Sequence, residues 1–139
     1  MFTKNTSLII PTRNRPLFLK NTFANLGNMA KTFKEILVID SSDAKIKEEV
    51  CQIAKKNNAR YFHTKASSSH QRNFGLHKKN YYKYTMFLDD DLQLVSKSFH
   101  EMNIAIERKS KIYDAYGFNL TSKKKSSFFE KLKNTKIFK

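Results

Sequence analysis

The sequence predicts an α/β fold, built on a mostly parallel sheet that is flanked by helices. Short apolar runs rich in β-branched and aromatic residues alternate along the chain with stretches whose apolar residues recur at helical spacing. This alternation is typical of parallel strands joined by helical crossovers. The length of 139 residues and a hydrophobic content of 40% suit one domain with its own core.

In the first half of the chain the pattern predicts three strands and two helices. The strands are expected over residues 7–10, 35–40 and 60–63. Residues 11–16, with two prolines and two arginines, predict a loop. The helix that follows is indicated by apolar residues at helical spacing: Leu19, Phe23, Leu26 and Ala30. Residues 41–43 predict the cap of a second helix, whose core face is Ile46, Val50, Ile53 and Ala54.

The second half continues the alternation. A third helix should begin at the serines of residues 67–69, and a fourth strand is expected in the apolar run that starts at Tyr84. Ser98 and Glu101 have the spacing of a capping box and predict the start of a fourth helix. Its apolar face would carry Phe99, Met102 and Ile106. Residues 112–120 predict a fifth strand.

The fourth strand runs into three carboxylates, Asp89, Asp90 and Asp91. Because side chains alternate along a strand, we expect Asp89 and Asp91 on one side and Asp90 on the other. In open α/β sheets ligands bind at this end of the strands. Two carboxylates on one side form part of an oxygen shell for Mg²⁺ or Mn²⁺, which water and phosphate oxygens would complete. The alternative for this stretch alone is a solvated acidic turn.

Lys and Arg number 27 against 12 Asp and Glu, which gives a net charge of +15. Such a charge indicates anionic partners: nucleotides, nucleic acid or an anionic membrane. The lysines are scattered, so compositional drift explains the charge equally well. Cys51 is the only cysteine, which excludes an internal disulfide. Neither a signal peptide nor a membrane span is indicated, so a cytoplasmic location is expected.

Residues 122–139 are basic and contain several apolar side chains. They predict either an amphipathic helix that lies on the inner face of an anionic membrane, or the start of a further structural element.

Polar residues at three strand ends should converge on the carboxyl edge of the sheet: Thr12 and Arg13, then Asp40, then Asp89 and Asp91. The three glycines of the chain form neither a dinucleotide fingerprint nor a Walker loop. A nucleotide bound at this edge would therefore hold its phosphates through a metal rather than through a glycine-rich loop.

Four segments of the sequence resemble family 2 glycosyltransferases of the GT-A fold. They are residues 8–16 (LIIPTRNRP), 35–42 (EILVIDSS), 71–76 (QRNFGL) and 87–91 (FLDDD). Their order and spacing carry the resemblance, which covers about residues 5–120. It implies a Rossmann-like three-layer α/β/α fold with a nucleotide-sugar-binding domain over residues 1–121. It also implies sugar transfer from a nucleotide-diphospho-sugar, first of all a UDP-sugar, to a glycan or lipid-linked acceptor.

The resemblance further implies roles for single residues. Pro11 and Thr12 would lie beside the base, and Asp40 would contact the base or the ribose. Asp89 and Asp91 match the D-x-D motif, which holds Mn²⁺ or Mg²⁺, and Arg72 would lie near the donor or buttress the acids. The donor-site residues expected in this way are Pro11, Thr12, Arg13, Asp40, Ser42, Arg72, Asp89 and Asp90, with Asp89 and Asp91 as metal ligands.

Relatives take the catalytic base and most acceptor contacts from a second half that follows the fifth strand. After Asp91 this sequence has four acids, and none is where a base is expected: Glu101, Glu107, Asp114 and Glu130. The resemblance thus implies the donor-binding half of a transferase, truncated at its C-terminus and inactive by itself. The rival hypothesis is a small basic nucleic-acid-binding protein. It explains the charge, but it leaves the acids unexplained, because a phosphate-binding surface should not carry an acidic cluster.

Overall fold

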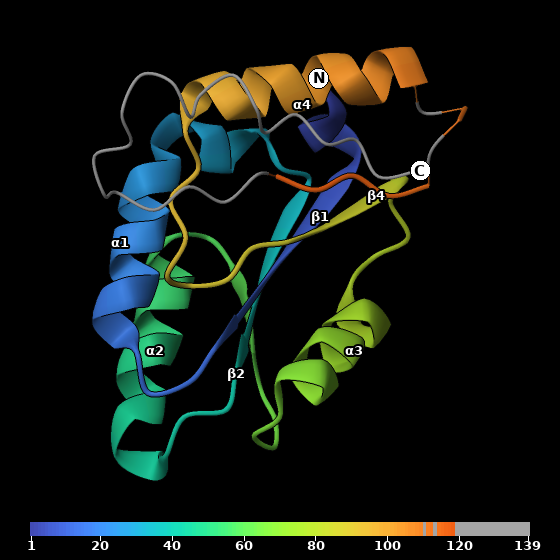
Figure 1. Ribbon diagram of the computed structural model, residues 1–139. Coiled ribbons are helices and arrows are strands. Elements are labelled where there is room, and N and C mark those ends of the chain that lie inside the picture. The colour runs from blue at the N-terminus through green and yellow to red at the C-terminus, as the bar shows by residue number, and fades with distance from the viewer. Residues whose placement is uncertain (110, 113, 119–139) are drawn as a thin grey trace, which may run out of the picture.

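The computed structural model describes residues 1–109, 111–112 and 114–118, and it has the predicted layered α/β architecture (Figure 1). A four-stranded sheet lies in the middle, with α1 and α2 on one face and α3 on the other. The helix α4 lies across the end of the sheet near the N-terminus. The membrane or extension segment expected over residues 122–139 lies outside the described residues.

All four strands are parallel, in the order β3-β2-β1-β4. Their bounds are β1 Thr6–Thr12, β2 Glu35–Asp40, β3 Arg60–His63 and β4 Tyr84–Phe87. The central strand β1 pairs with β2 along nearly its whole length, from Ser7↔Glu35 to Thr12↔Asp40. Its pairing with β4 ends at Ile9↔Phe87. Thr12 and Asp40 therefore stand side by side at the carboxyl edge, as the sequence predicts.

The helices are α1 Pro16–Leu26, α2 Ala44–Lys56, α3 Ser68–Lys78 and α4 Ser96–Lys109, and two 3₁₀ helices are η1 Phe2–Asn5 and η2 Gly27–Thr32. Among the described residues no helix is long and apolar enough to cross a membrane. The N-cap of α3 is Ser67, whose hydroxyl accepts a hydrogen bond from the backbone N–H of His70, so the predicted start of this helix is confirmed.

Alternation along the strands divides the core into two parts. Leu8, Ile10 and Val38 face the larger part, which α1, α2 and α4 cover. Ile9, Leu37 and Ile39 face α3. On that side α3 approaches the sheet closely, because a Cβ at Gly75 would lie 2.8 Å from Cγ2 of Ile9. The absence of a side chain at residue 75 thus sets how near α3 lies to β1.

Glu35, at the start of β2, fixes the opposite edge of the sheet. Its carboxylate accepts hydrogen bonds from Ser7 Oγ at 2.6 Å and from Arg60 Nη1 at 2.8 Å. It also accepts from Asn80, through the backbone N at 2.7 Å and Nδ2 at 2.8 Å. One side chain therefore ties together β1, β2, β3 and the segment that leads into β4.

Several boundaries differ from the prediction. The first helix ends at Leu26, because Gly27 adopts a φ of +48° and Ala30 belongs to η2. The fourth helix starts at Ser96, so Ser98 lies inside the helix and cannot be its N-cap. The capping-box prediction is therefore wrong. The described part of residues 112–120 contains no strand. The first strand continues through Pro11, whose missing N–H costs nothing on the β4 side, since that pairing has already ended.

Candidate functional site

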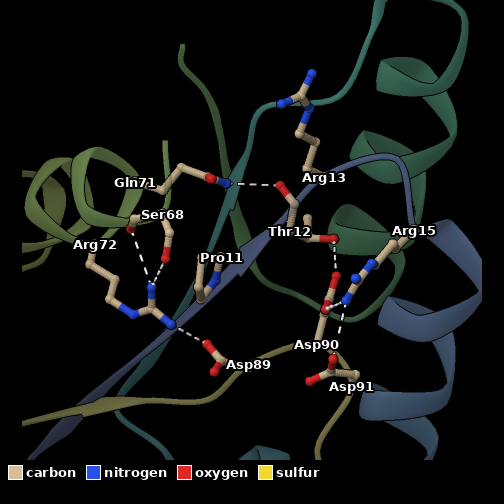
Figure 2. A pocket seen from close by; sticks show the side chains of 10 residues that line it. All are labelled: Pro11, Thr12, Arg13, Arg15, Ser68, Gln71, Arg72, Asp89, Asp90 and Asp91. Carbon is tan, nitrogen blue, oxygen red and sulfur yellow. Dashed lines mark hydrogen bonds and ion pairs between the residues drawn. The ribbon is translucent and has the colours of Figure 1, made fainter. Parts of the chain in front are cut away.

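A cleft of about 400 Å³ opens at the carboxyl edge of β1 and β4 (Figure 2). It lies between the β1–α1 loop, the start of α3 and the acidic turn after β4. The residues that line it are Pro11, Thr12, Arg13, Arg15, Ser68, Gln71, Arg72, Asp89, Asp90 and Asp91. Of the three groups expected at this edge, Thr12 with Arg13 and Asp89 with Asp91 line the cleft. Asp40, the second group, is not among the lining residues, and neither is Ser42.

The acids follow β4 in a turn, since the strand ends at Phe87 and the backbone N of Leu92 donates to Asp89 O at 3.2 Å. Simple strand alternation therefore does not place their side chains. Asp90 is buried, with 6% of its surface exposed, whereas Asp89 and Asp91 are about half exposed. The turn is tied to α1, because Thr22 Oγ1 donates to the carbonyl oxygen of Asp90 at 2.8 Å.

Asp90 is the structural centre of the acidic turn. Its carboxylate accepts a hydrogen bond from Thr12 Oγ1 at 2.6 Å and pairs with Arg15 Nη1 at 3.3 Å. Burial raises the pKa of the Asp90 carboxyl above its ordinary value, while the Thr12 hydroxyl and the Arg15 guanidinium oppose that rise. The charge of Asp90 in turn raises the pKa of Arg15. Asp90 thus joins the ends of β1 and β4.

Arg15 also pairs with Asp91, through Nη1 and Oδ2 at 3.2 Å. Arg15 is the N-cap residue of α1, and Pro16 occupies the first helical position. The preceding residue, Asn14, has a φ of +54°, a conformation that asparagine tolerates better than most residues. This turn of the backbone directs the Arg15 side chain back toward the acids.

Arg72 pairs with Asp89, the acid that Arg15 does not contact, from the opposite side of the acidic turn. Its Nη2 forms an ion pair with Asp89 Oδ1, and its Nη1 donates to the carbonyl oxygen of Ser68 at 3.3 Å. Figure 2 shows Arg72 and Arg15 on opposite sides of the acidic turn, whereas Arg13 points away from it. Arg72 therefore buttresses an acid in the free protein, which is one of the two roles that the family resemblance allowed.

Gln71, one residue before Arg72, is buried and locks α3 to the ends of two strands. Its Nε2 donates to the carbonyl oxygens of Thr12 and Ile39, both at 2.8 Å. Buried backbone carbonyls at a sheet edge need such partners. Gln71 thereby fixes the first turn of α3, from which Arg72 reaches into the cleft.

Asp40 is completely buried, and other side chains occupy both of its oxygens. Oδ1 accepts from the backbone N of Ser42 at 2.8 Å and from its Oγ at 2.5 Å, and Oδ2 accepts from the Tyr61 hydroxyl at 2.8 Å. Burial and the bond to Asp40 raise the pKa of Tyr61 well above its ordinary range, so Tyr61 remains a donor. Ser42 Oγ in turn accepts from the backbone N of Asn14 at 2.8 Å. Asp40 and Ser42 therefore position the loop that carries Arg15.

The acids suit a cation only if another molecule completes its coordination. Within the described ranges no three His, Cys, Asp or Glu side chains are grouped to hold a metal ion. Asp89 and Asp91 each engage an arginine through one oxygen, and the second oxygen accepts no hydrogen bond from the described residues. Mg²⁺ commonly takes one or two carboxylates together with substrate phosphates. The donor set fits a cation that is shared with a phosphate ligand.

Comparison with known proteins places this geometry in a family. Residues 7–135 match the model of glycosyl transferase family 2. The chain belongs to this family. No curated protein matches it. The predicted family is therefore confirmed, together with a layered GT-A-type fold.

Solved structures share the fold at low sequence identity. Two forms of TarS from S. aureus, the crystal structure of TarS and that of TarS 1-349, are 18% identical, with TM-scores of 0.56 and 0.57 over 76% of this chain. A 4-diphosphocytidyl-2C-methyl-D-erythritol synthase from Anaerococcus prevotii DSM 20548 is also 18% identical, with a TM-score of 0.59 over 77% of the chain. The chain spans 20%, 33% and 52% of these three structures respectively.

Three lining residues, Arg15, Ser68 and Gln71, were not predicted as site residues. Arg15 lies in the loop that the sequence marks by its prolines and arginines, and Gln71 stands in the segment QRN beside the predicted Arg72. Only the folded backbone shows that they turn into the cleft.

Proposed function

We propose that the cleft binds a nucleotide-diphospho-sugar together with Mn²⁺ or Mg²⁺, and that Asp89 and Asp91 supply the protein ligands of the cation. The observation that carries the proposal is the grouping of Thr12, Arg15, Arg72 and the three acids around one cleft at the carboxyl edge of a family 2 glycosyltransferase. When bound, the cation would neutralise the charge that develops on the leaving nucleoside diphosphate.

The other side chains that line the cleft would orient the donor. The family resemblance expects the base beside Pro11 and Thr12, and we propose that Arg72, on another side of the cleft, contacts the phosphates. Asp40 and Ser42 act through the β1–α1 loop, as positioning residues. Direct contact of Asp40 with the base remains a prediction, since it would require Ser42 or Tyr61 to give up a hydrogen bond. A UDP-sugar as donor and a glycan or lipid-linked acceptor also remain predictions.

No acid suited to activate an acceptor hydroxyl lies at the described cleft, other than the three that the proposal assigns to the donor side. Glu107 pairs with the N-terminal amine at 3.4 Å, and Glu101 pairs with Lys97 at 3.9 Å, both on α4. We therefore propose donor binding as the property of the described cleft.

The test measures the thermal shift that UDP causes with and without Mn²⁺. The proposal expects a shift that requires both, and an Asp91→Ala variant that stays folded and shows none. Asp114→Ala removes an exposed carboxylate outside the cleft and serves as the control. An unchanged shift in Asp91→Ala would reject the metal assignment. A salt-dependent shift with RNA instead of UDP would favour the nucleic-acid hypothesis.

A further inference from the structure

Each acid of the cleft already has a cationic partner in the free protein. Arg15 bridges Asp90 and Asp91, and Arg72 pairs with Asp89. The two carboxylates assigned to the metal are thus held by two arginines that come from different helices and from opposite sides (Figure 2).

We propose that Arg15 and Arg72 are exchangeable counter-ions. They neutralise Asp91 and Asp89 until a nucleoside diphosphate enters, and they then move to its phosphates while the cation takes the carboxylates. Metal and nucleotide consequently bind together much better than either binds alone. The inference rests on the proposed function of the cleft and adds to it how the two ligands depend on each other.

The first argument is repulsion. A divalent cation that binds Asp91 alone must approach the guanidinium that lies 3.2 Å from the same carboxylate. Like charges at such short range repel strongly at the reduced dielectric of a protein cleft. The cation must also break a charge-assisted hydrogen bond, which is among the stronger polar contacts in proteins. Metal alone is therefore expected to bind weakly.

The second argument is the charge of the cleft. Its lining carries three arginines, at residues 13, 15 and 72, and three aspartates, at residues 89 to 91, so the formal charges cancel. A cation alone or a diphosphate alone would disturb this balance, whereas the two together largely restore it. A planar guanidinium with its fork of donors suits phosphate oxygens as well as it suits a carboxylate.

The third argument is that the exchange needs only side-chain motion. The backbone of Arg15 is fixed as the N-cap of α1, with its carbonyl oxygen accepting from the N–H of Leu19 at 3.1 Å. Its side chain is 50% exposed and lies over the ring of Phe18, with Cζ 5.5 Å from the ring centroid. The Arg72 side chain is 32% exposed. Both arginines can therefore change rotamer without disturbing the core.

The experiment measures the affinity for Mn²⁺ by the loss of the free-ion EPR signal, first without nucleotide and then with saturating UDP. Their ratio is the coupling factor, and reciprocity requires that Mn²⁺ raise the affinity for UDP by the same factor. We expect a factor at the upper end of the usual range of about 5–150-fold in the wild type. Arg15→Gln and Arg72→Gln should each tighten binding of Mn²⁺ alone by roughly tenfold and lower the coupling factor.

Arg13→Gln is the matched control, since it removes a positive charge from the same cleft without opening an ion pair of the described residues. It should tighten Mn²⁺ alone clearly less than the other two variants. The inference is overturned if Arg15→Gln and Arg72→Gln leave the affinity for Mn²⁺ alone equal to that of Arg13→Gln. Absence of UDP binding by the wild type at any Mn²⁺ concentration would instead reject the proposed function. In that case the measurement of Mn²⁺ affinity without nucleotide still tests whether Arg15 and Arg72 weaken binding of the metal.

Discussion

Replacing Gly75 by alanine tests the close contact between α3 and β1. Glycine inside a helix normally costs about 1 kcal/mol relative to alanine, so Gly→Ala at such a position usually stabilises. Here the new methyl would lie 2.8 Å from Ile9 Cγ2 and 3.2 Å from Ile39 Cγ1, both on fully buried side chains. Ile9 is β-branched and cannot rotate freely, so α3 must shift instead.

The magnitude follows from opposing effects. Overpacking of a tight core typically costs about 1–3 kcal/mol, and the gain in helix propensity offsets about 1 kcal/mol of it. We expect the free energy of unfolding to fall by about 1 kcal/mol, which corresponds to a Tm lower by about 3 °C for a chain of this size. The shift of α3 should also disturb Gln71, one turn away, and thereby weaken binding of UDP with Mn²⁺.

Urea unfolding followed by circular dichroism measures the change. Gly117→Ala is the control, because a Cβ at Gly117 meets nothing within 4 Å. In an Ile9→Ala background the contacts with Ile9 are removed and only the 3.2 Å contact with Ile39 Cγ1 remains, so the same substitution should there destabilise the protein clearly less. If Gly75→Ala raises stability with Ile9 in place, the close packing of α3 on β1 does not exist as described.

Three further predictions concern pH, the C-terminal segment and catalysis. Burial alone would raise the pKa of Glu35, but its hydrogen bonds lower the pKa below the ordinary 4.5. The stability that Glu35 contributes is therefore fully present above that value and is lost as the pH falls below it. In urea titrations Glu35→Gln should unfold more easily than the wild type at pH 7, and its free energy of unfolding should fall less between pH about 5 and 3. Removing residues 121–139 should weaken binding to anionic vesicles in a sedimentation assay, at about 1 kcal/mol per lysine near the surface, and leave UDP binding unchanged; equal sedimentation of both forms would argue against a membrane role. The purified 139-residue chain should release UDP from UDP-sugars only slowly, because base assistance is worth about 10²- to 10⁴-fold; rapid acceptor-dependent transfer would show that a base has been missed.

The central strands β1 and β2 were predictable because each is a short apolar run that is buried in a parallel sheet. The outer strands β3 and β4 are less buried, but their aromatic residues still favour a strand. The predicted bounds of the second and third strands, residues 35–40 and 60–63, coincide with β2 and β3. The fourth helix was misplaced because Ser98 and Glu101 match a capping pattern that lies inside the helix. Local patterns of this kind cannot show which of several nearby residues starts a helix.

The site was predictable only in part, for a different reason. Thr12 ends β1 and Asp89 follows two residues after β4, so the parallel sheet brings both to its carboxyl edge and spacing in the sequence predicts their convergence. The direction of the three carboxylates is set by the turn after β4, which the spacing does not predict. Arg15 reaches the acids because the preceding residue, Asn14, adopts a positive φ, and because Ser42 Oγ accepts a hydrogen bond from the backbone N–H of Asn14. The burial of Asp40 depends on Tyr61, which comes from another strand. Such contacts are tertiary, and no local pattern in the sequence encodes them.

The strand order β3-β2-β1-β4 has a consequence for the order of events during folding. The contacts of β1 with β2 and of β2 with β3 join segments that are near in sequence and can form while the chain is being synthesised from its N-terminus. The pairing of β4 with β1 must wait, and the bond between Thr12 and Asp90 spans 78 residues. Closing so long a loop is slow, because the chain must give up conformational entropy before the contact that compensates for it can form. The edge that carries the cleft is therefore assembled last, and until then the β4-facing edge of β1 is exposed to pairing with other chains.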